Sequence, residues 1–310
     1  MQPTAPRVAV LIPCWNEAVA IGRVVGDFRA ALPEADIYVY DNNSSDGTAD
    51  AARAAGATVR HEILQGKGNV IRRAFADVQA DISVLVDGDD TYDATAAPAM
   101  VAKLVAEQLD MVTGTRVTDI QAAYRPGHRL GNAVLTGMVA AIFGNRISDM
   151  LSGYRVFSRR FVKTFPALAA GFETETEFTV HALELKMPLG EVVTKYKDRP
   201  VGSVSKLNTY RDGIRILRTI VILVKEERPL QFFSIAALLL LLAGIGVGLP
   251  VVLEFLHTGL VMRLPTGVLA TGLVIVAFLA LNAGLVLDSV SRGRKEVKRL
   301  AYLSVPGPGM

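Results

Sequence analysis

Cysteine is almost absent from this 310-residue chain, which contains only Cys14. A single cysteine excludes an intrachain disulfide and any metal site built from several cysteines. Two glycine-rich fingerprints are also missing, because neither Gly-Xxx-Gly-Xxx-Xxx-Gly after the first predicted strand nor a Gly-Lys-Ser/Thr loop occurs. Dinucleotide oxidoreductases and P-loop NTPases use such loops to approach phosphates, so both classes are excluded.

A secretory signal is not evident at the amino terminus. The only early apolar run, residues 8–12, is too short for such a peptide. We therefore expect the amino-terminal domain to stay in the cytosol.

The composition nevertheless indicates a membrane part, since 51% of the residues are hydrophobic and the mean hydropathy is +0.34. The net charge is +3 and the isoelectric point is near 9.0. Because the basic residues concentrate near the hydrophobic segments, positive-inside bias explains them better than a nucleic-acid partner does.

The first 115 or so residues alternate short β-rich runs with alanine-rich helical stretches. This order is typical of successive strand–helix units and predicts the α/β class with a mostly parallel sheet. The expected strands are residues 8–12, 37–40, 58–60, 82–86 and 111–113, and the expected helices are residues 18–31, 48–55, 69–78 and 97–107.

An apolar run that starts at Ile82 stops abruptly on the acids Asp87, Asp89 and Asp90. A buried strand ends where the chain meets water, so we expect these acids at the carboxyl end of a strand, where open α/β sheets hold ligands. Two carboxylates spaced Asp-Xxx-Asp can offer hard oxygens to one Mg²⁺ or Mn²⁺, with phosphates completing the shell. An Asp-rich turn, favoured for backbone reasons alone, is the alternative.

Polar or aromatic residues follow four of the predicted strands, at residues 13–17, 41–48, 87–90 and 114–116. Four such ends at one crevice favour a nucleotide pocket that contains a metal. Lys67 lies between two glycines just before a predicted helix. It is expected either to face a phosphate or to belong to an ordinary glycine-rich turn.

The chain becomes basic and irregular after residue 116. Residues 133–143 are apolar but too short to span a bilayer, so they predict an interfacial or core helix. Thr174 and Glu177 fit a capping box ahead of a helical run at residues 178–186. Candidates for a general base, each with a structural role as the alternative, are Asp149, Glu173, Glu175 and Glu177.

Two apolar segments near the carboxyl end, residues 232–253 and 264–287, are each near the roughly 20 residues that a spanning helix needs. Basic residues flank the pair outside, so both ends are expected in the cytoplasm. Residues 206–229 predict a basic amphipathic helix on an anionic membrane surface, with a solvated helix of the catalytic domain as the alternative. Gly244 and Gly248 form a Gly-Xxx-Xxx-Xxx-Gly face that packs the hairpin or joins subunits.

Together the motifs resemble those of family 2 glycosyltransferases that charge polyprenyl phosphates, the group of dolichyl-phosphate mannose synthase and its bacterial relatives. The resemblance covers about the first two thirds of the chain and implies a GT-A fold. The matching segments are residues 13–17, 41–48, 66–68, 87–89, 114–116 and 152–155, with Arg199 and residues 205–206. With the apolar pattern, four segments are expected: the GT-A domain at 1–205, the basic interfacial helix at 206–229, two transmembrane helices at 230–289 and a basic cytoplasmic tail at 290–310.

The resemblance also implies roles for individual residues. Asp87 and Asp89 would hold Mg²⁺ or Mn²⁺. The sequence departs from the family at Thr91, where a glutamine is usual, and at Ala133, where a serine is usual. A UDP- or GDP-sugar would be held by Pro13, Trp15, Glu17, Asp41, Lys67, Asp87, Gly88, Arg199 and Lys206; the acceptor phosphate by Arg116, Arg125 and Arg129; and the predicted catalytic residues are Asp89, Arg116 and Asp149.

These features predict inverting transfer of a sugar from a nucleoside diphosphate sugar to a polyprenyl phosphate, by a multi-pass protein of the inner membrane whose catalytic domain faces the cytoplasm. A phosphate monoester has a second pKa of about 6, so a dedicated base is optional. The only tryptophan is Trp15, which excludes the Gln-Xxx-Xxx-Arg-Trp motif of processive polysaccharide synthases. A glycosyltransferase or nucleotidyltransferase with another acceptor, a non-catalytic nucleotide-binding scaffold, and a homo-oligomeric state stay open.

Overall fold

The computed structural model describes residues 6–117, 137, 148–200 and 209–308. The chain forms two compact units, one of Met1–Thr219 with Lys298–Met310 and one of Ile220–Val297. The four segments expected from the sequence have other boundaries than these two units. They stay predictions.

The first unit alternates strands and helices, as the sequence pattern predicts. Its strands are β1 (Val8–Cys14), β2 (Asp36–Asp41), β3 (Thr58–His61), β4 (Ile82–Leu85), β5 (Met111–Val117), β6 (Arg155–Ser158) and β7 (Leu189–Lys195). Its helices are α1 (Ala18–Ala31), α2 (Thr48–Ala54), α3 (Lys67–Asp77), a short 3-10 helix (Ala94–Ala96), α4 (Ala97–Ala106), α6 (Arg159–Thr164) and α7 (Thr174–Glu184).

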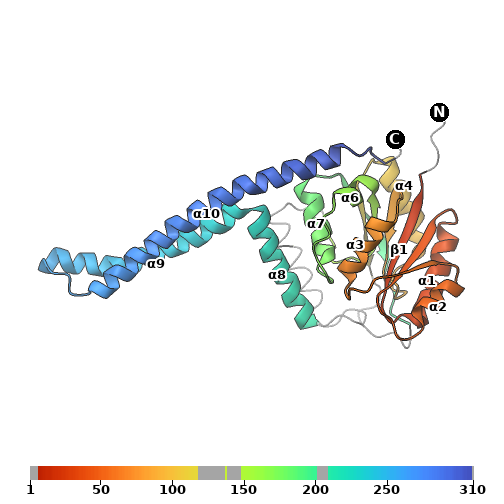
Figure 1. Ribbon diagram of the computed structural model, residues 1–310, viewed down its shortest axis with the longest axis horizontal. Coiled ribbons are helices and arrows are strands. Elements are labelled where there is room, and N and C mark those ends of the chain that lie inside the picture. Colours follow the sequence, from red (N-terminus) through yellow and green to blue (C-terminus); the bar gives the residue numbers. More distant parts are fainter. Residues whose placement is uncertain (1–5, 118–136, 138–147, 201–208, 309–310) are drawn as a thin grey trace. The chain divides into compact units, whose positions relative to one another are not determined.

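The described strands form one sheet in the order β3-β2-β1-β4-β6-β5-β7. Figure 1 labels its strand β1. Inside it, β1 pairs in parallel with β2 and β4, and β5 pairs in parallel with β7. Of the described strands, only β6 runs antiparallel to its neighbours β4 and β5. The predicted α/β class with a mostly parallel sheet is confirmed, although the sequence pattern predicts neither β6 nor β7.

Residues of β1 alternate between two hydrophobic cores, because successive side chains of a strand point to opposite faces. Val10 and Ile12 pack with residues of α1, α2 and α4. Ala9 and Leu11 pack in the other core with residues of α3, α6 and α7. Helices on both faces explain why the inner strands are continuous apolar runs, and they leave the carboxyl ends of the strands as the place for polar chemistry.

The start of α7 contradicts the expected capping box. Glu173 is the N-cap without a side-chain cap bond, and the buried hydroxyl of Thr174 has no hydrogen-bond partner. The carboxylate of Glu177 instead accepts the backbone N–H groups of Leu168 and Ala169, both at 2.9 Å. The capping-box prediction is therefore wrong, because the loop before the helix supplies the donors. Apart from Gly137, which is helical, the helix predicted at residues 133–143 lies outside the described residues.

The second unit contains α9 (Pro229–Thr258) and most of α10 (Leu264–Leu303), while α8 (Thr209–Glu227) spans the boundary between the units. Both α9 and α10 are long and apolar enough to cross a membrane. The expected tail at 290–310 continues α10 as helix as far as Leu303.

Small residues bring α9 and α10 close together. A Cβ atom added at Gly244 would lie 3.2 Å from the carbonyl oxygen of Ala270, and one added at Gly248 would lie 3.1 Å from the Cβ of Ala270. One added at Gly284 would lie 2.9 Å from the Cβ of Phe233, so the two helices run antiparallel (Figure 1). Of the two uses expected for Gly244 and Gly248, packing of the hairpin is the one observed.

Candidate active site

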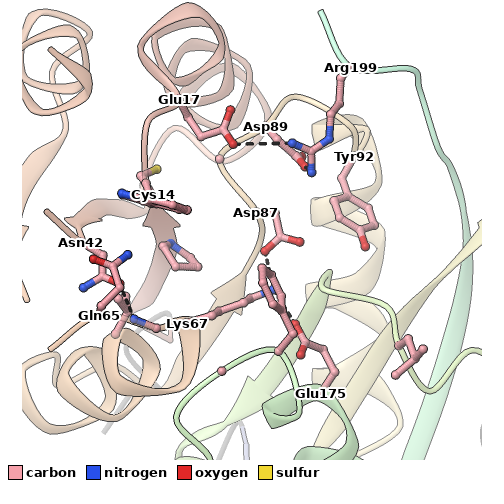
Figure 2. A pocket seen from close by; sticks show the side chains of 18 of the residues that line it. Cys14, Glu17, Asn42, Gln65, Lys67, Asp87, Asp89, Tyr92, Glu175 and Arg199 are labelled. Carbon is pink, nitrogen blue, oxygen red and sulfur yellow. Dashed lines mark hydrogen bonds and ion pairs between the residues drawn. The ribbon is translucent and has the colours of Figure 1, made fainter. Parts of the chain in front are cut away.

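A cavity of about 360 Å³ lies in the first unit, at the carboxyl ends of β1 and β4 (Figure 2). This is the position that open α/β sheets favour for ligands. Its wall combines carboxylates, cations, aromatic rings and apolar side chains from segments far apart in the sequence. The lining residues are Pro13, Cys14, Trp15, Glu17, Asn42, Gln65, Gly66, Lys67, Val70, Asp87, Gly88, Asp89, Tyr92, Arg116, Leu151, Gly171, Phe172, Glu175, Tyr196, Arg199, Arg215 and Ile216.

The turn after β1 brings Trp15 and Glu17 to the wall. Asn16 between them has a φ of 53°, in the left-handed region that asparagine tolerates. Its backbone N–H donates to the hydroxyl of Ser44, and that of Glu17 donates to the hydroxyl of Thr48, both at 2.8 Å. The segment after β2 therefore holds this turn in place.

Asn42 organises the loop that precedes α3. Its side-chain amide donates to the carbonyl oxygens of Glu62 and Leu64 at 2.7 and 2.9 Å, and its Oδ1 accepts the N–H of Gly66 at 2.7 Å. The neighbouring Asp41 is predicted to bind the nucleotide sugar, but it is not among the residues that line the cavity. It is buried, with its Oδ2 3.3 Å from Nδ1 of His61.

The predicted metal ligands Asp87 and Asp89 lie shortly after the end of β4, and both line the cavity. Thr91 fixes Asp89, because its hydroxyl and its backbone N–H donate to Oδ1 at 2.6 and 3.3 Å. Gly88 leaves no room for a side chain, since an added Cβ would clash with Sγ of Cys14. The Asp-Gly-Asp segment thus packs tightly against the end of β1.

Each of these aspartates shares a cationic side chain with a glutamate (Figure 2). Nζ of Lys67 contacts Asp87 and lies 2.5 Å from Oε1 of Glu175. For Arg199, Nη2 lies 2.5 Å from Oδ2 of Asp89 and Nη1 lies 3.6 Å from Oε1 of Glu17. Lys67 and Arg199 are predicted to bind the nucleotide sugar, and in this structure both pair with carboxylates.

Burial sets the electrostatics of this cluster. It raises the pKa of Asp89, Asp87 adds to that rise, and Arg199 opposes it. Burial also raises the pKa of Glu175, against the opposing effect of Lys67. Burial lowers the pKa of Lys67, but Asp87 and Glu175 outweigh it, so that the pKa lies above its ordinary value. Burial therefore disfavours the negative charge of Asp89 and Glu175, and the neighbouring cations only partly offset this effect.

The charge and the donor atoms both fit a divalent cation. Fully ionised, the four carboxylates and two cationic side chains leave two negative charges, which one Mg²⁺ or Mn²⁺ would neutralise. Within the described part of the chain, no group of three or more His, Cys, Asp or Glu side chains could hold a metal. Oxygens of a bound phosphate would therefore have to complete the coordination of a cation at Asp87 and Asp89.

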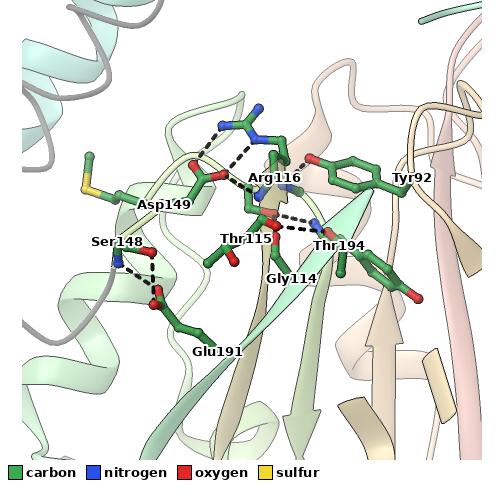
Figure 3. Close-up of polar contacts among 12 residues, drawn as sticks. Tyr92, Gly114, Thr115, Arg116, Ser148, Asp149, Glu191 and Thr194 are labelled. Carbon is green, nitrogen blue, oxygen red and sulfur yellow. Dashed lines mark hydrogen bonds and ion pairs between the residues drawn. The ribbon is translucent and has the colours of Figure 1, made fainter. Parts of the chain in front are cut away.

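Arg116, near the end of β5, is held by Asp149 (Figure 3). Nε and Nη2 of the guanidinium donate to the two carboxylate oxygens at 2.7 and 2.8 Å. The same guanidinium lies 5.5 Å from the centroid of the Tyr196 ring. Bidentate pairing fixes the plane of the arginine. In this arrangement Asp149 orients Arg116, and both of its oxygens are already engaged.

Some wall residues are not indicated by any motif. Tyr92 accepts the N–H of Gly153 at 2.8 Å, and its ring lies 5.3 Å from that of Tyr196. Arg215 lines the cavity, although its helical spacing with other arginines suggests a membrane surface. The predicted site residues Arg125, Arg129 and Lys206 lie outside the described residues.

The chain is similar in sequence to known glycosyltransferases. Residues 9–165 match the profile of Glycosyl transferase family 2. Glycosyltransferase AglJ of Haloferax volcanii is 33% identical over 308 residues, covering 97% of this chain and 99% of that protein. The dolichyl-phosphate hexose transferase of the same organism is 27% identical over 226 residues, covering 73% of this chain and 97% of that protein.

Solved structures share the fold at lower identity. Glucosyl-3-phosphoglycerate synthase from Mycobacterium tuberculosis, crystallised with Mn²⁺, uridine diphosphate and glucosyl-3-phosphoglycerate, superimposes with a TM-score of 0.56 at 21% identity. The match covers 71% of this chain and 79% of that one. The GT-A fold expected from the sequence is therefore confirmed.

Proposed function

Because this chain belongs to glycosyl transferase family 2, we propose that it transfers a hexose from a nucleoside diphosphate sugar to a membrane polyprenyl phosphate, with inversion at the anomeric carbon. Family membership makes it a nucleotide-sugar glycosyltransferase. The hexose, the lipid acceptor and the stereochemical course are the proposed parts.

The composition of the cavity wall is the observation that carries the proposal. Asp87 and Asp89 offer the oxygens that a cation bound to a diphosphate needs, and Arg116 offers a fixed positive charge for a second phosphate. Apolar side chains complete the same wall, among them Leu151 and Phe172. A polyprenyl phosphate combines an anionic head with an apolar chain, and the similar dolichyl-phosphate hexose transferase is named for the same class of acceptor.

On the donor side, Trp15 and Glu17 would lie against the nucleotide, while Asp87 and Asp89 would hold Mg²⁺ or Mn²⁺. The cation would supply Lewis-acid stabilisation of the departing diphosphate. Arg199 would add a second positive charge there after leaving the carboxylate of Asp89. The GT-A neighbour crystallised with Mn²⁺ and uridine diphosphate supports this use of the site.

On the acceptor side, Arg116 would hold the lipid phosphate, and Asp149 would keep the guanidinium oriented. A phosphate oxygen would attack the anomeric carbon as the bond from that carbon to the diphosphate breaks, which releases the nucleoside diphosphate. Since the phosphate is largely dianionic near neutral pH, no side chain has to remove a proton. One displacement inverts the anomeric configuration.

We further propose that α9 and α10 cross the membrane as a hairpin and that the first unit faces the cytoplasm. Their length and apolar composition support two spans. The cations at the end of α10, including Arg292, Arg294 and Lys295, support a cytoplasmic location of that end.

The decisive experiment is a product assay. The full-length protein in detergent is incubated with Mg²⁺ or Mn²⁺, a panel of UDP- and GDP-hexoses and a polyprenyl phosphate, and the lipid is analysed by mass spectrometry. A lipid phosphate whose mass increases by one hexose, with nucleoside diphosphate released, supports the proposal. Release of pyrophosphate would identify a nucleotidyltransferase, and no lipid product with any donor would refute the proposed acceptor.

The Asp89→Asn variant tests the site within the same assay. Losing a carboxylate ligand of the cation should reduce turnover by about 100-fold or more. Asp93→Asn is the matched control, because Asp93 caps the 3-10 helix through the N–H of Thr95 and asparagine caps equally well. Normal turnover in Asp89→Asn would refute the proposed role of Asp89 as a cation ligand.

A further inference from the structure

Lys67 is buried between carboxylates from two separate elements. It begins α3, Asp87 follows β4, and Glu175 lies in the first turn of α7. The side chains of Lys67 and Glu175 are 8% and 6% exposed, whereas that of Asp87 is 29% exposed. Asp87 is therefore the member of this trio that a ligand reaches most easily.

Neighbouring atoms leave little space into which the ammonium group of Lys67 could move. Gly153 packs against the ion pair, since a Cβ added there would lie 3.1 Å from Nζ of Lys67 and would clash with the carboxylate of Asp87. Glu175 accepts from Lys67 through Oε1, while its buried Oε2 has no hydrogen-bond partner. An ammonium has three donors, so Glu175 retains the capacity to take a second hydrogen bond from Lys67.

A carboxylate that is paired with an ammonium presents less negative charge to a metal. Lys67 and a divalent cation therefore compete for Asp87. Glu175 weakens this competition because its carboxylate also pairs with Lys67. It can keep the ammonium group when Asp87 binds the cation. Arg199 is placed in a similar way between Asp89 and Glu17.

We propose that Glu175 is a positioning residue that retains Lys67 and so frees Asp87 to bind a divalent cation together with the donor diphosphate. This inference rests on the proposed use of Asp87 as a cation ligand. It assigns Lys67 a role as the counter-ion inside the site in place of the expected contact with a phosphate.

Binding measurements on the full-length protein in detergent test the inference without turnover. Free Mn²⁺ is followed by electron paramagnetic resonance during titration, alone and with UDP or GDP present. In Glu175→Gln, Lys67 has only Asp87 as its carboxylate partner, so the Kd for Mn²⁺ should rise by about tenfold. Glu177→Gln removes a carboxylate from the same helix without touching Lys67, and its Kd should match that of the wild type.

The double variant Lys67→Gln/Glu175→Gln separates this role from a merely structural one. Removing the competing ammonium should recover most of the Mn²⁺ affinity lost in Glu175→Gln. In steady-state assays of Glu175→Gln, the donor KM should rise by about tenfold at limiting Mn²⁺, with kcat at saturating Mn²⁺ changed less than about twofold.

Two results overturn the inference alone: unchanged Mn²⁺ affinity in Glu175→Gln, or a double variant that binds no better than Glu175→Gln. Failure of the wild-type protein to bind Mn²⁺ with either nucleotide overturns the proposed cation site and this inference with it. If the product assay gives a glycolipid without Mn²⁺ or Mg²⁺, the proposed transfer reaction is supported but the proposed cation site is refuted.

Discussion

Thr91 holds the carboxylate of Asp89 through two hydrogen bonds, from its hydroxyl at 2.6 Å and from its N–H at 3.3 Å. In the dolichyl-phosphate mannose synthases, which the sequence resembles, a glutamine at this position helps the metal. In this protein the shorter threonine orients the aspartate. The neighbouring Asp90 has a φ of 58° and pairs with Arg23 at 3.2 Å and Lys197 at 3.5 Å, so it ties the acid segment to the segment after β7.

We expect Thr91→Val to weaken the use of metal, because valine keeps the shape but cannot donate to Asp89. A buried hydrogen bond to a charged group contributes about 1.5–3 kcal/mol, so the Mn²⁺ concentration for half-maximal rate should rise by about tenfold or more. Thr91→Ser keeps the donor and should remain within about threefold of the wild type. The measurement is the initial rate as a function of Mn²⁺, and equal curves for Val and Thr would contradict the orienting role.

Asp149→Asn distinguishes an orienting carboxylate from a general base. Asparagine cannot accept both N–H groups of Arg116, so the guanidinium loses its fixed plane and the acceptor KM should rise by about 10-fold to 100-fold. A base would instead affect kcat, and its loss would remove the acidic limb of the pH–rate profile. Initial rates over a range of acceptor concentrations and pH values decide between these two roles.

At the scale of elements, the hairpin of α9 and α10 depends on positions without side chains. Gly244 faces the backbone of Ala270, whereas a Cβ added at Gly246, two residues further along α9, would meet nothing within 4 Å. The two glycines therefore form a matched pair for testing helix packing.

We expect Gly244→Leu to lower the free energy of unfolding by about 1–3 kcal/mol, because the added side chain forces the helices apart. Gly246→Leu should change it by less than about 0.5 kcal/mol or stabilise the helix slightly. Thermal unfolding in detergent, followed by circular dichroism, measures both. Equal effects of the two substitutions would mean that the helices do not pack through Gly244.

At the scale of the whole molecule, the chain returns to its first unit after the hairpin. Tyr302, near the end of α10, donates its hydroxyl to the buried carboxylate of Asp110 at 2.7 Å, and its ring lies 4.8 Å from the guanidinium of Arg160. Lys298 donates to Glu184 at 2.9 Å. The last part of the segment expected as a basic cytoplasmic tail thus packs within the first unit.

Tyr302→Phe should lower the free energy of unfolding by about 1–2 kcal/mol, since Asp110 loses one hydrogen bond while the ring and its contact with Arg160 remain. Leu303→Ala is the control, because Leu303 is 69% exposed and should have little effect. Chemical denaturation of the full-length protein measures both. A Tyr302→Phe protein as stable as the control would show that this contact contributes nothing to stability.

The sequence by itself determined the features that depend on neighbours along the chain. The alternation of apolar runs and helical stretches identified the α/β class, the acids after β4 identified the carboxyl end of a strand, and two long apolar runs identified α9 and α10. Most of the residues predicted to hold the sugar donor line the same cavity, Asp41 being an exception.

Only the tertiary structure decided which charges meet. Lys67 and Glu175 are 108 residues apart, and Arg116 and Asp149 are 33 apart, yet each pair forms an ion pair that no sequence pattern indicates. The insertion of antiparallel β6 between β4 and β5 likewise depends on pairing between distant segments. Periodicity reports the environment of a residue along its own element, whereas the partner of a buried charge is set by the packing of several elements at once.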